Sequence, residues 1–144
     1  SISIIVKVTI NKDSANIVTV TVTELTTLAD PNYLIEFKDK LTKEYNYCLL
    51  GINRSDHTDR FDEFLITDID PPSPLLSQVH LNEGQHIYNI YELTDAQVTA
   101  LNFNAIDVTE YTLVEGDGQV IVNYIVTADT NYSGASSENT FYEG

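Results

Sequence analysis

The chain has 144 residues, of which 42% are hydrophobic, and a formal net charge of −15. All seven Lys and Arg side chains lie within residues 1–60, whereas residues 61–144 carry fourteen acidic side chains and no basic one. This distribution argues against nucleic-acid binding, because such affinity comes from Lys and Arg neutralising phosphates, and against an anionic membrane surface. We expect the acidic part to face water or a basic partner protein.

The length is that of a single domain, and the hydrophobic fraction is enough to bury a core without disulfides or a metal. No apolar run approaches the roughly 20 residues that cross a bilayer, and no secretory signal is visible. The chain contains no Met, and Ser1 is small enough to follow a removed initiator Met. We therefore expect a product made in the cytoplasm. The single cysteine, Cys48, lies among apolar residues and is expected to be a buried thiol.

Residues 1–28 predict an N-terminal β-hairpin. Apolar β-branched residues alternate with polar ones along residues 2–10 and again along residues 17–23, which is typical of strands with one wet face. The polar residues 11–16 are expected to join the two strands as a hairpin loop. Because an isolated hairpin is marginal, its apolar face must pack on the body or on a neighbouring chain. We expect an arm whose interface residues include Val18, Val20 and Val22.

Residues 29–127 predict a β-rich core. Short segments with strand composition recur here and are separated by turn-like clusters. They are residues 33–38, 44–52, 61–67, 76–81, 86–93, 107–115 and 118–127. The sequence Gly116-Asp117-Gly118 favours a tight hairpin turn, since glycine adopts positive φ without steric cost. The fold class expected is all-β, an antiparallel sandwich or barrel.

One short helix is predicted over residues 95–103. Thr94 is suited to cap its start, and Gln97 occupies the capping-box position. From residue 128 to residue 144 the chain is polar and turn-rich, which indicates a flexible C-terminal tail. Alternatively this tail orders on a partner, with Phe141 and Tyr142 as its anchor.

Three histidines, His57, His80 and His86, raise the question of a metal site. Zinc needs three or four ligands, and no matching ligand spacing is present, so we expect no metal or other cofactor. The nucleophile, phosphate-loop and paired-acid motifs of enzymes also give no clear match, which favours a protein without catalytic activity. Acidic residues around the segment 68–72 leave calcium open, although a solvated acidic loop is the simpler interpretation. They are Asp56, Asp59, Asp62, Asp68 and Asp70.

Tyr88 and Tyr91 lie three apart in one predicted strand. They should therefore point to opposite faces of the sheet, one packed and one exposed. Exposed aromatic residues on a sheet are common interface anchors, so both tyrosines are candidates for an interface.

Several aromatic-rich segments together carry a resemblance to a known group of proteins. They are Tyr33-Leu34-Ile35-Glu36-Phe37, Tyr45-Asn46-Tyr47-Cys48, Arg60-Phe61-Asp62-Glu63-Phe64, Tyr88-Asn89-Ile90-Tyr91-Glu92, and Val114-Glu115-Gly116 with Gln119-Val120. This arrangement, over residues 31–126, resembles small virion proteins of tailed bacteriophages that infect Bacteroidetes, including crAss-like relatives. The resemblance implies a β-rich structural protein of the virion with no catalytic residues.

The expected function is thus a structural subunit of a phage capsid or head–tail connector. Its partners would be other virion proteins with basic surfaces, and it would oligomerise on a template because a charge of −15 opposes self-association. The alternative is a calcium- or carbohydrate-binding β-sandwich module of a fibre or adhesin.

Overall fold

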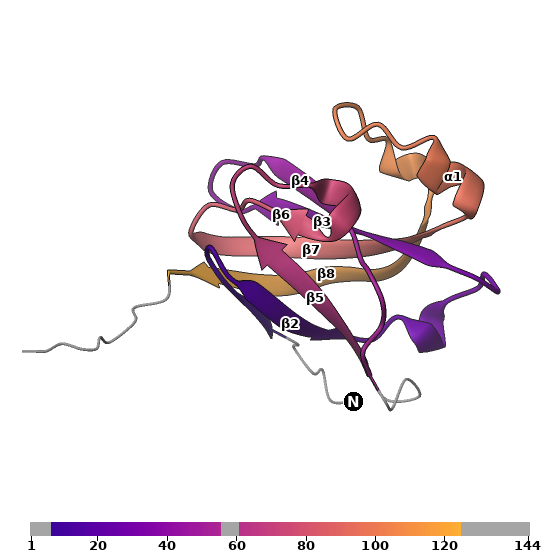
Figure 1. Cartoon of the computed structure of the whole chain (residues 1–144), viewed down its shortest axis with the longest axis horizontal. Coiled ribbons are helices and arrows are strands. Elements are labelled where there is room, and N and C mark those ends of the chain that lie inside the picture. The colour runs from indigo at the N-terminus through magenta and orange to yellow at the C-terminus, as the bar shows by residue number, and fades with distance from the viewer. Residues whose placement is uncertain (1–6, 56–60, 125–144) are drawn as a thin grey trace, which may run out of the picture.

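The computed structural model describes residues 7–55 and 61–124, which fold into two β-sheets facing one another (Figure 1). The larger sheet has the strand order β1 (Lys7–Asn11), β8 (Thr112–Asn123), β7 (Gly84–Leu93), β3 (Asn32–Asp39) and β4 (Tyr45–Leu49). The smaller sheet has the order β2 (Ala15–Val20), β5 (Asp62–Asp68) and β6 (Gln78–Val79). The β-rich class is as predicted, but both sheets are mixed, since β1–β8 and β5–β6 are parallel pairs.

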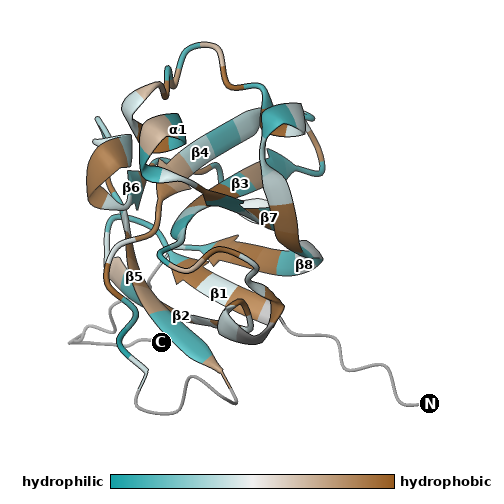
Figure 2. Ribbon diagram, turned by 90° about the vertical axis from the view of Figure 1, so that its right-hand side faces the viewer, coloured by the Kyte–Doolittle hydropathy of each residue, from teal (hydrophilic) through white to brown (hydrophobic). Residues whose placement is uncertain are grey.

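The predicted N-terminal hairpin is wrong. β1 pairs with β8, with Lys7 opposite Gln119, whereas β2 pairs with β5, with Val18 opposite Phe64. The short turn between β1 and β2 therefore carries the chain from one sheet to the other. The physical reason is that the apolar side of each strand is buried in a common core, which places the two strands in facing layers (Figure 2).

Asn16 secures this change of sheet. Its side-chain oxygen accepts a hydrogen bond from the Asn11 backbone N–H at 2.9 Å, and its amide donates to the Asn11 carbonyl at 3.1 Å. These two bonds satisfy backbone groups that a hairpin partner would otherwise have satisfied.

The segment Gly116-Asp117-Gly118 forms a bulge inside one long strand, so the predicted hairpin turn is also wrong. β8 runs unbroken through it, and its pairing with β7 shifts between Tyr88 opposite Gly118 and Ile90 opposite Glu115. Asp117 has a φ of 57°, which absorbs the extra residue. A bulge explains both the turn-like composition and the continuity of the strand.

The short helix α1 (Asp95–Thr99) follows β7, and its capping box is as predicted. Thr94 accepts from the Gln97 backbone N–H, and the Gln97 side chain accepts from the Thr94 backbone N–H. The helix is shorter than expected. Three single 3-10 turns complete the described elements: η1 (Thr23–Leu25), η2 (Pro74–Leu76) and η3 (Val108–Glu110).

Candidate interaction surfaces

The three valines predicted to lie on an exchanged arm are part of the chain's own core. Val18 and Val20 are each 2% exposed and Val22 is fully buried. Their apolar faces are covered by the larger sheet, so the same chain already supplies the partner that the alternating pattern demands. The arm predicted over residues 1–28 is therefore corrected to two core strands, as far as residues 7–28 show.

The spacing of Tyr88 and Tyr91 predicts one packed and one exposed ring; the packed ring is found but the exposed one is not, and Tyr88 is corrected from an interface candidate to a core residue. Tyr88 is fully buried, and its hydroxyl donates to Glu115 at 3.1 Å. Burial, with the Glu115 carboxylate nearby, raises the pKa of Tyr88 well above its ordinary value. Tyr91 is only half-buried. Phe141 and Tyr142 lie outside the described residues.

A groove of about 460 Å³ runs beside β4. The rings of Tyr45 and Tyr47 are stacked on one side of it, with 6.3 Å between centroids and 14° between planes. Other lining residues come from two distant segments: Pro72, Pro74, Val79, Phe103, Asn104 and Ile106. We call this feature the tyrosine groove.

Glu36 of β3 connects the tyrosine groove to the neighbouring strand β7 through two hydrogen bonds. This carboxylate is 4% exposed, and it accepts hydrogen bonds at 2.9 Å from both the Tyr47 hydroxyl and the Asn89 amide. Burial, followed by the hydrogen bond to Glu36, raises the pKa of Tyr47. Tyr47 is therefore a fixed, neutral donor.

A second surface is apolar and lies on the outer side of the smaller sheet. Ile17 of β2 is 49% exposed and is paired with Leu65 of β5. Beside Leu65 lies a depression of about 350 Å³, in which Ile52 is 85% exposed and Leu76 is 70% exposed. We call it the apolar hollow, and its lining residues are Gly51, Ile52, Arg54, Leu65, Thr67, Leu76 and Ser77.

Sequence reasoning misses this surface. It is assembled from the loop after β4, from β5 and from η2, so no single stretch of sequence carries its pattern. The one local signal is the apolar pair Leu75-Leu76 next to Pro74, in a segment whose composition resembles that of a strand. Clustered exposed apolar side chains of this kind mark interaction sites on soluble proteins.

Of the acidic residues considered for calcium, the described ones, Asp62, Asp68 and Asp70, form no group that could hold a metal ion. Asp62 and Asp68 stand at opposite ends of β5, and both are fully buried. Asp62 accepts from the backbone N–H groups of Val22 and Thr23 at 2.7 and 2.9 Å. Burial alone would raise the pKa of Asp62, but these hydrogen bonds outweigh it and lower the pKa. Asp56 and Asp59 lie outside the described residues.

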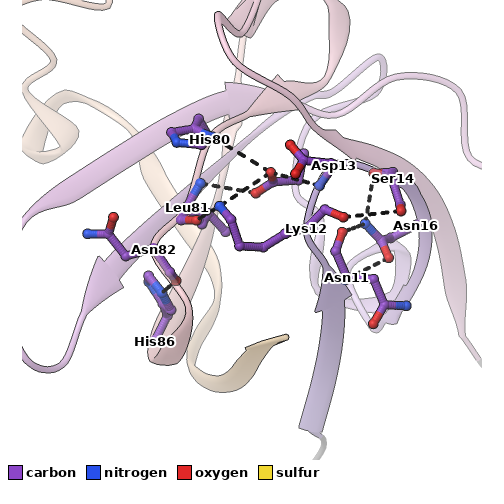
Figure 3. Close-up of polar contacts among 10 residues, drawn as sticks. Asn11, Lys12, Asp13, Ser14, Asn16, His80, Leu81, Asn82 and His86 are labelled. Carbon is purple, nitrogen blue, oxygen red and sulfur yellow. Dashed lines mark hydrogen bonds and ion pairs between the residues drawn. The ribbon is translucent and has the colours of Figure 1, made fainter. Parts of the chain in front are cut away.

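Asp68 belongs to a buried polar network that joins the turn after β1 to the smaller sheet. Figure 3 shows its neighbours Lys12, Asp13 and Leu81. Asp68 forms an ion pair with Lys12 and accepts a hydrogen bond from the Leu81 backbone N–H at 3.0 Å. His80 approaches it, with 3.7 Å between His80 Nδ1 and Asp68 Oδ1. Both carboxylate oxygens of Asp68 therefore contact donors from the protein itself, and the residue has a structural role at one end of β5.

Of the three histidines, His80 and His86 lie within the described residues, and their rings contact different groups. His86 is 1% exposed and bonds through Nε2 to the Asn82 carbonyl at 2.8 Å, away from the Asp68–His80 contact. Within residues 7–55 and 61–124, no group of three or more His, Cys, Asp or Glu side chains is arranged to hold a metal ion. His57 lies outside these ranges.

Cys48 is fully buried, as predicted, and burial raises the pKa of its thiol to about 12. Such a thiol is inert at physiological pH. Among the residues that the structure describes, no helix is long and apolar enough to cross a membrane.

No protein family, no curated protein and no solved structure matches this chain.

Proposed function

We propose that this chain is a structural subunit of a tailed-phage virion and binds neighbouring capsid or head–tail connector proteins through the apolar hollow. The observation that carries the proposal is the exposure of Ile52 and Leu76 around this depression. The resemblance of residues 31–126 to small phage virion proteins supports the choice of particle.

The energetics favour binding to a partner over self-association. Burying Ile52 and Leu76 would each contribute about 1.5–3 kcal/mol before the costs of association. The charge of −15 repels a second free copy but attracts a partner with a basic surface. Individual surface ion pairs would add about 1 kcal/mol or less, so the apolar contact sets the affinity.

The test is incorporation of Leu76→Asp into virions. Leu76 is exposed, so the variant should keep the wild-type melting temperature, yet its carboxylate would be desolvated in the interface. We expect at least tenfold less Leu76→Asp than wild type in purified virions, because each loss of about 1.4 kcal/mol in binding free energy weakens affinity tenfold. Quantitative mass spectrometry of the virions gives the measurement.

Leu41→Asp is the matched control, because Leu41 is 89% exposed and lies in the β3–β4 turn outside the apolar hollow. It should be incorporated as wild type is. Absence of the wild-type chain from virions, or equal incorporation of both variants, would refute the proposal.

Carbohydrate binding at the tyrosine groove is a second candidate, and the stacked pair Tyr45–Tyr47, together with the groove-lining amides of Asn46 and Asn104, favours it. Aromatic faces with polar edges offer both an apolar platform and hydrogen bonds, which a sugar ring also needs. A saccharide that binds only the folded chain must raise its melting temperature. Measuring the melting temperatures of wild type and Tyr45→Ala with a panel of mono- and oligosaccharides tests this. If no saccharide raises the melting temperature of wild type, carbohydrate binding is rejected.

A further inference from the structure

We propose that the free edge of β4, inside the tyrosine groove, takes up an extended segment of a partner protein as an additional β-strand. The segment is uncharged along the groove and acidic where it passes the turn between β3 and β4. The tyrosine groove shares no lining residue with the apolar hollow, so this inference goes beyond the proposed function and does not depend on it.

The outer backbone groups of β4 are unpaired. Among the described strands, β4 pairs with β3 alone. At the two ends of that pair, the Glu44 carbonyl accepts from β3 and the Leu50 N–H donates to β3, both at 2.9 Å. Residues of an antiparallel strand direct their backbone groups alternately to either side, so those of Tyr45, Tyr47 and Leu49 point away from β3. No group of the described residues forms a hydrogen bond with them.

The sequence of β4 also leaves this edge open to strand addition. Natural edge strands are commonly protected by Lys, by Pro or by a bulge. β4 contains neither Pro nor a charged residue, and its pairing with β3 has no register shift. Tyr45 and Tyr47 together present two N–H donors and two carbonyl acceptors at the spacing of an extended chain. This edge therefore fits one kind of occupant, a β-strand.

The tyrosine groove follows the same edge. Tyr45, Asn46 and Tyr47 all line it, although consecutive side chains of a strand point to opposite faces of the sheet. A groove that contacts three residues in a row must therefore run along the side of the strand. Val79 and Phe103 also line the groove, so the side chains of an added strand would meet apolar contacts there.

The charges around the groove define the segment further. None of the described side chains that line the groove is charged, and an ionised group placed there would lose water without gaining a partner. Lys38, Lys40 and Lys43 lie in or beside the turn that leads into β4, and Lys38 Nζ is 5.6 Å from the centroid of the Tyr45 ring. None of these three lysines forms an ion pair with a described residue. An acidic end of the segment would pair with them.

The backbone of β4 favours a peptide over a saccharide in this groove. A sugar ring can stack on the faces of Tyr45 and Tyr47, but it leaves the outer N–H and carbonyl groups without the regular partners that a strand supplies. An added strand uses both the backbone and the aromatic faces. The two occupants therefore differ in what they require of the β4 backbone.

Backbone hydrogen exchange, measured by NMR on the full-length chain, tests the proposal. The probes are two short synthetic peptides of alternating valine and threonine, with aspartates at the C-terminal end in one and at the N-terminal end in the other. An antiparallel segment brings its C-terminal end to Tyr45, and a parallel segment brings its N-terminal end there. The peptide that binds thus also reports the direction of the added strand.

We expect exchange of the Tyr47 and Leu49 N–H groups to slow about tenfold at a peptide concentration ten times the Kd, because exchange then proceeds from the free chain. The N–H groups of Asn46 and Cys48 already face β3 and should change much less, so each spectrum contains its own control. Replacing the aspartates of the peptide by lysines should weaken binding, because the turn before β4 is basic.

A pair of variants at Tyr45 separates backbone pairing from contact with the ring. Tyr45→Ala removes the ring, whereas Tyr45→Pro also removes the outward N–H, at the first residue of an edge strand, where proline is tolerated. Their melting temperatures should agree. Tyr45→Pro should bind the peptide roughly tenfold more weakly than Tyr45→Ala, because it lacks the donor and obstructs pairing. A peptide N-methylated at alternate amides should not bind wild type.

Unchanged exchange at Tyr47 and Leu49 with both peptides would overturn the proposal. Equal binding by Tyr45→Ala and Tyr45→Pro, together with binding of the N-methylated peptide, would also overturn it, because the groove would then recognise side chains or sugars only. Protection that rises with protein concentration in the absence of peptide would assign the edge to a second copy instead. Incorporation of Leu76→Asp into virions is measured separately, so the proposed function and this inference can each fail alone.

Discussion

Lys12 and Asp68 form an ion pair in which 3.6 Å separate Nζ from Oδ1 and both side chains are almost wholly shielded from water. Lys12 also donates to the Leu81 carbonyl, and Asp68 accepts from the Asp13 backbone N–H at 3.2 Å. The pair thus joins the turn that changes sheets to the end of β5. A buried pair contributes less through its attraction than through the penalty for leaving one charge alone.

Asp68→Ala should destabilise the fold by about 3–5 kcal/mol, because it leaves the Lys12 ammonium buried without a counter-ion. Urea unfolding at pH 7 gives this difference, and Asp70→Ala, at an exposed site two residues on, should change it by less than about 0.5 kcal/mol. Lys12→Met should recover part of the loss in the Asp68→Ala background. Equal stability of the two aspartate variants would mean that the buried pair has no structural role.

Gly118→Ala should be strongly destabilising, since a Cβ there would lie 2.0 Å from Cε2 of the buried Tyr88 ring. The ring or the strand must shift, which costs about 1–3 kcal/mol or more in a packed core. Gly51→Ala is the control, because its added Cβ meets nothing within 4 Å. It should be neutral or slightly stabilising. Thermal unfolding of both variants compares them, and a neutral Gly118→Ala would show that the bulge is loosely packed.

Sequence alternation predicted most of the individual strands but not their partners. The ranges 33–38 and 86–93 lie within β3 and β7, because a period of two identifies which side of a strand is buried. It does not identify the strand alongside, so the pattern over residues 7–22 indicates the right buried face and the wrong hairpin.

The surfaces were less predictable than the strands. The hollow brings Ile52, Leu65 and Leu76 together from three separate segments, and no local pattern encodes their proximity. Likewise, the acidity of Asp62 suggests a solvated or cation-binding loop. Its burial and its hydrogen bonds to the chain after β2 depend on tertiary structure.

Asp62→Asn should cost about 1.5–3 kcal/mol at pH 7, because charge-assisted hydrogen bonds to buried N–H groups are lost. Hydrogen bonding holds the folded-state pKa of Asp62 below its ordinary value of 3.8. The stabilisation is therefore present above the unfolded-state pKa and is lost as the pH falls through the folded-state pKa. Urea titrations from pH 7 to pH 2 should show the two proteins converging at acid pH. A constant difference across that range would contradict this.

Glu115→Gln should behave in the opposite way. Burial raises the pKa of Glu115 above its ordinary value of 4.5, even though Tyr88 and the Thr21 backbone donate to it. The folded state therefore favours the protonated form, and stability falls as the pH rises from the unfolded-state pKa through the folded-state pKa. Glutamine keeps an acceptor for Tyr88 and removes the charge.

We expect Glu115→Gln to match wild type near pH 3 and to be more stable than wild type at pH 8, where the folded state has to hold the ionised carboxylate. Asp62 adds to the effect, because its negative charge also raises the pKa of Glu115. Asp62→Asn should thus reduce the gain from Glu115→Gln in the double variant. Urea unfolding of wild type, Glu115→Gln, Asp62→Asn and the double variant at both pH values gives the coupling free energy between the two carboxylates. A Glu115→Gln chain less stable than wild type at pH 8 would show that the ionised carboxylate is needed.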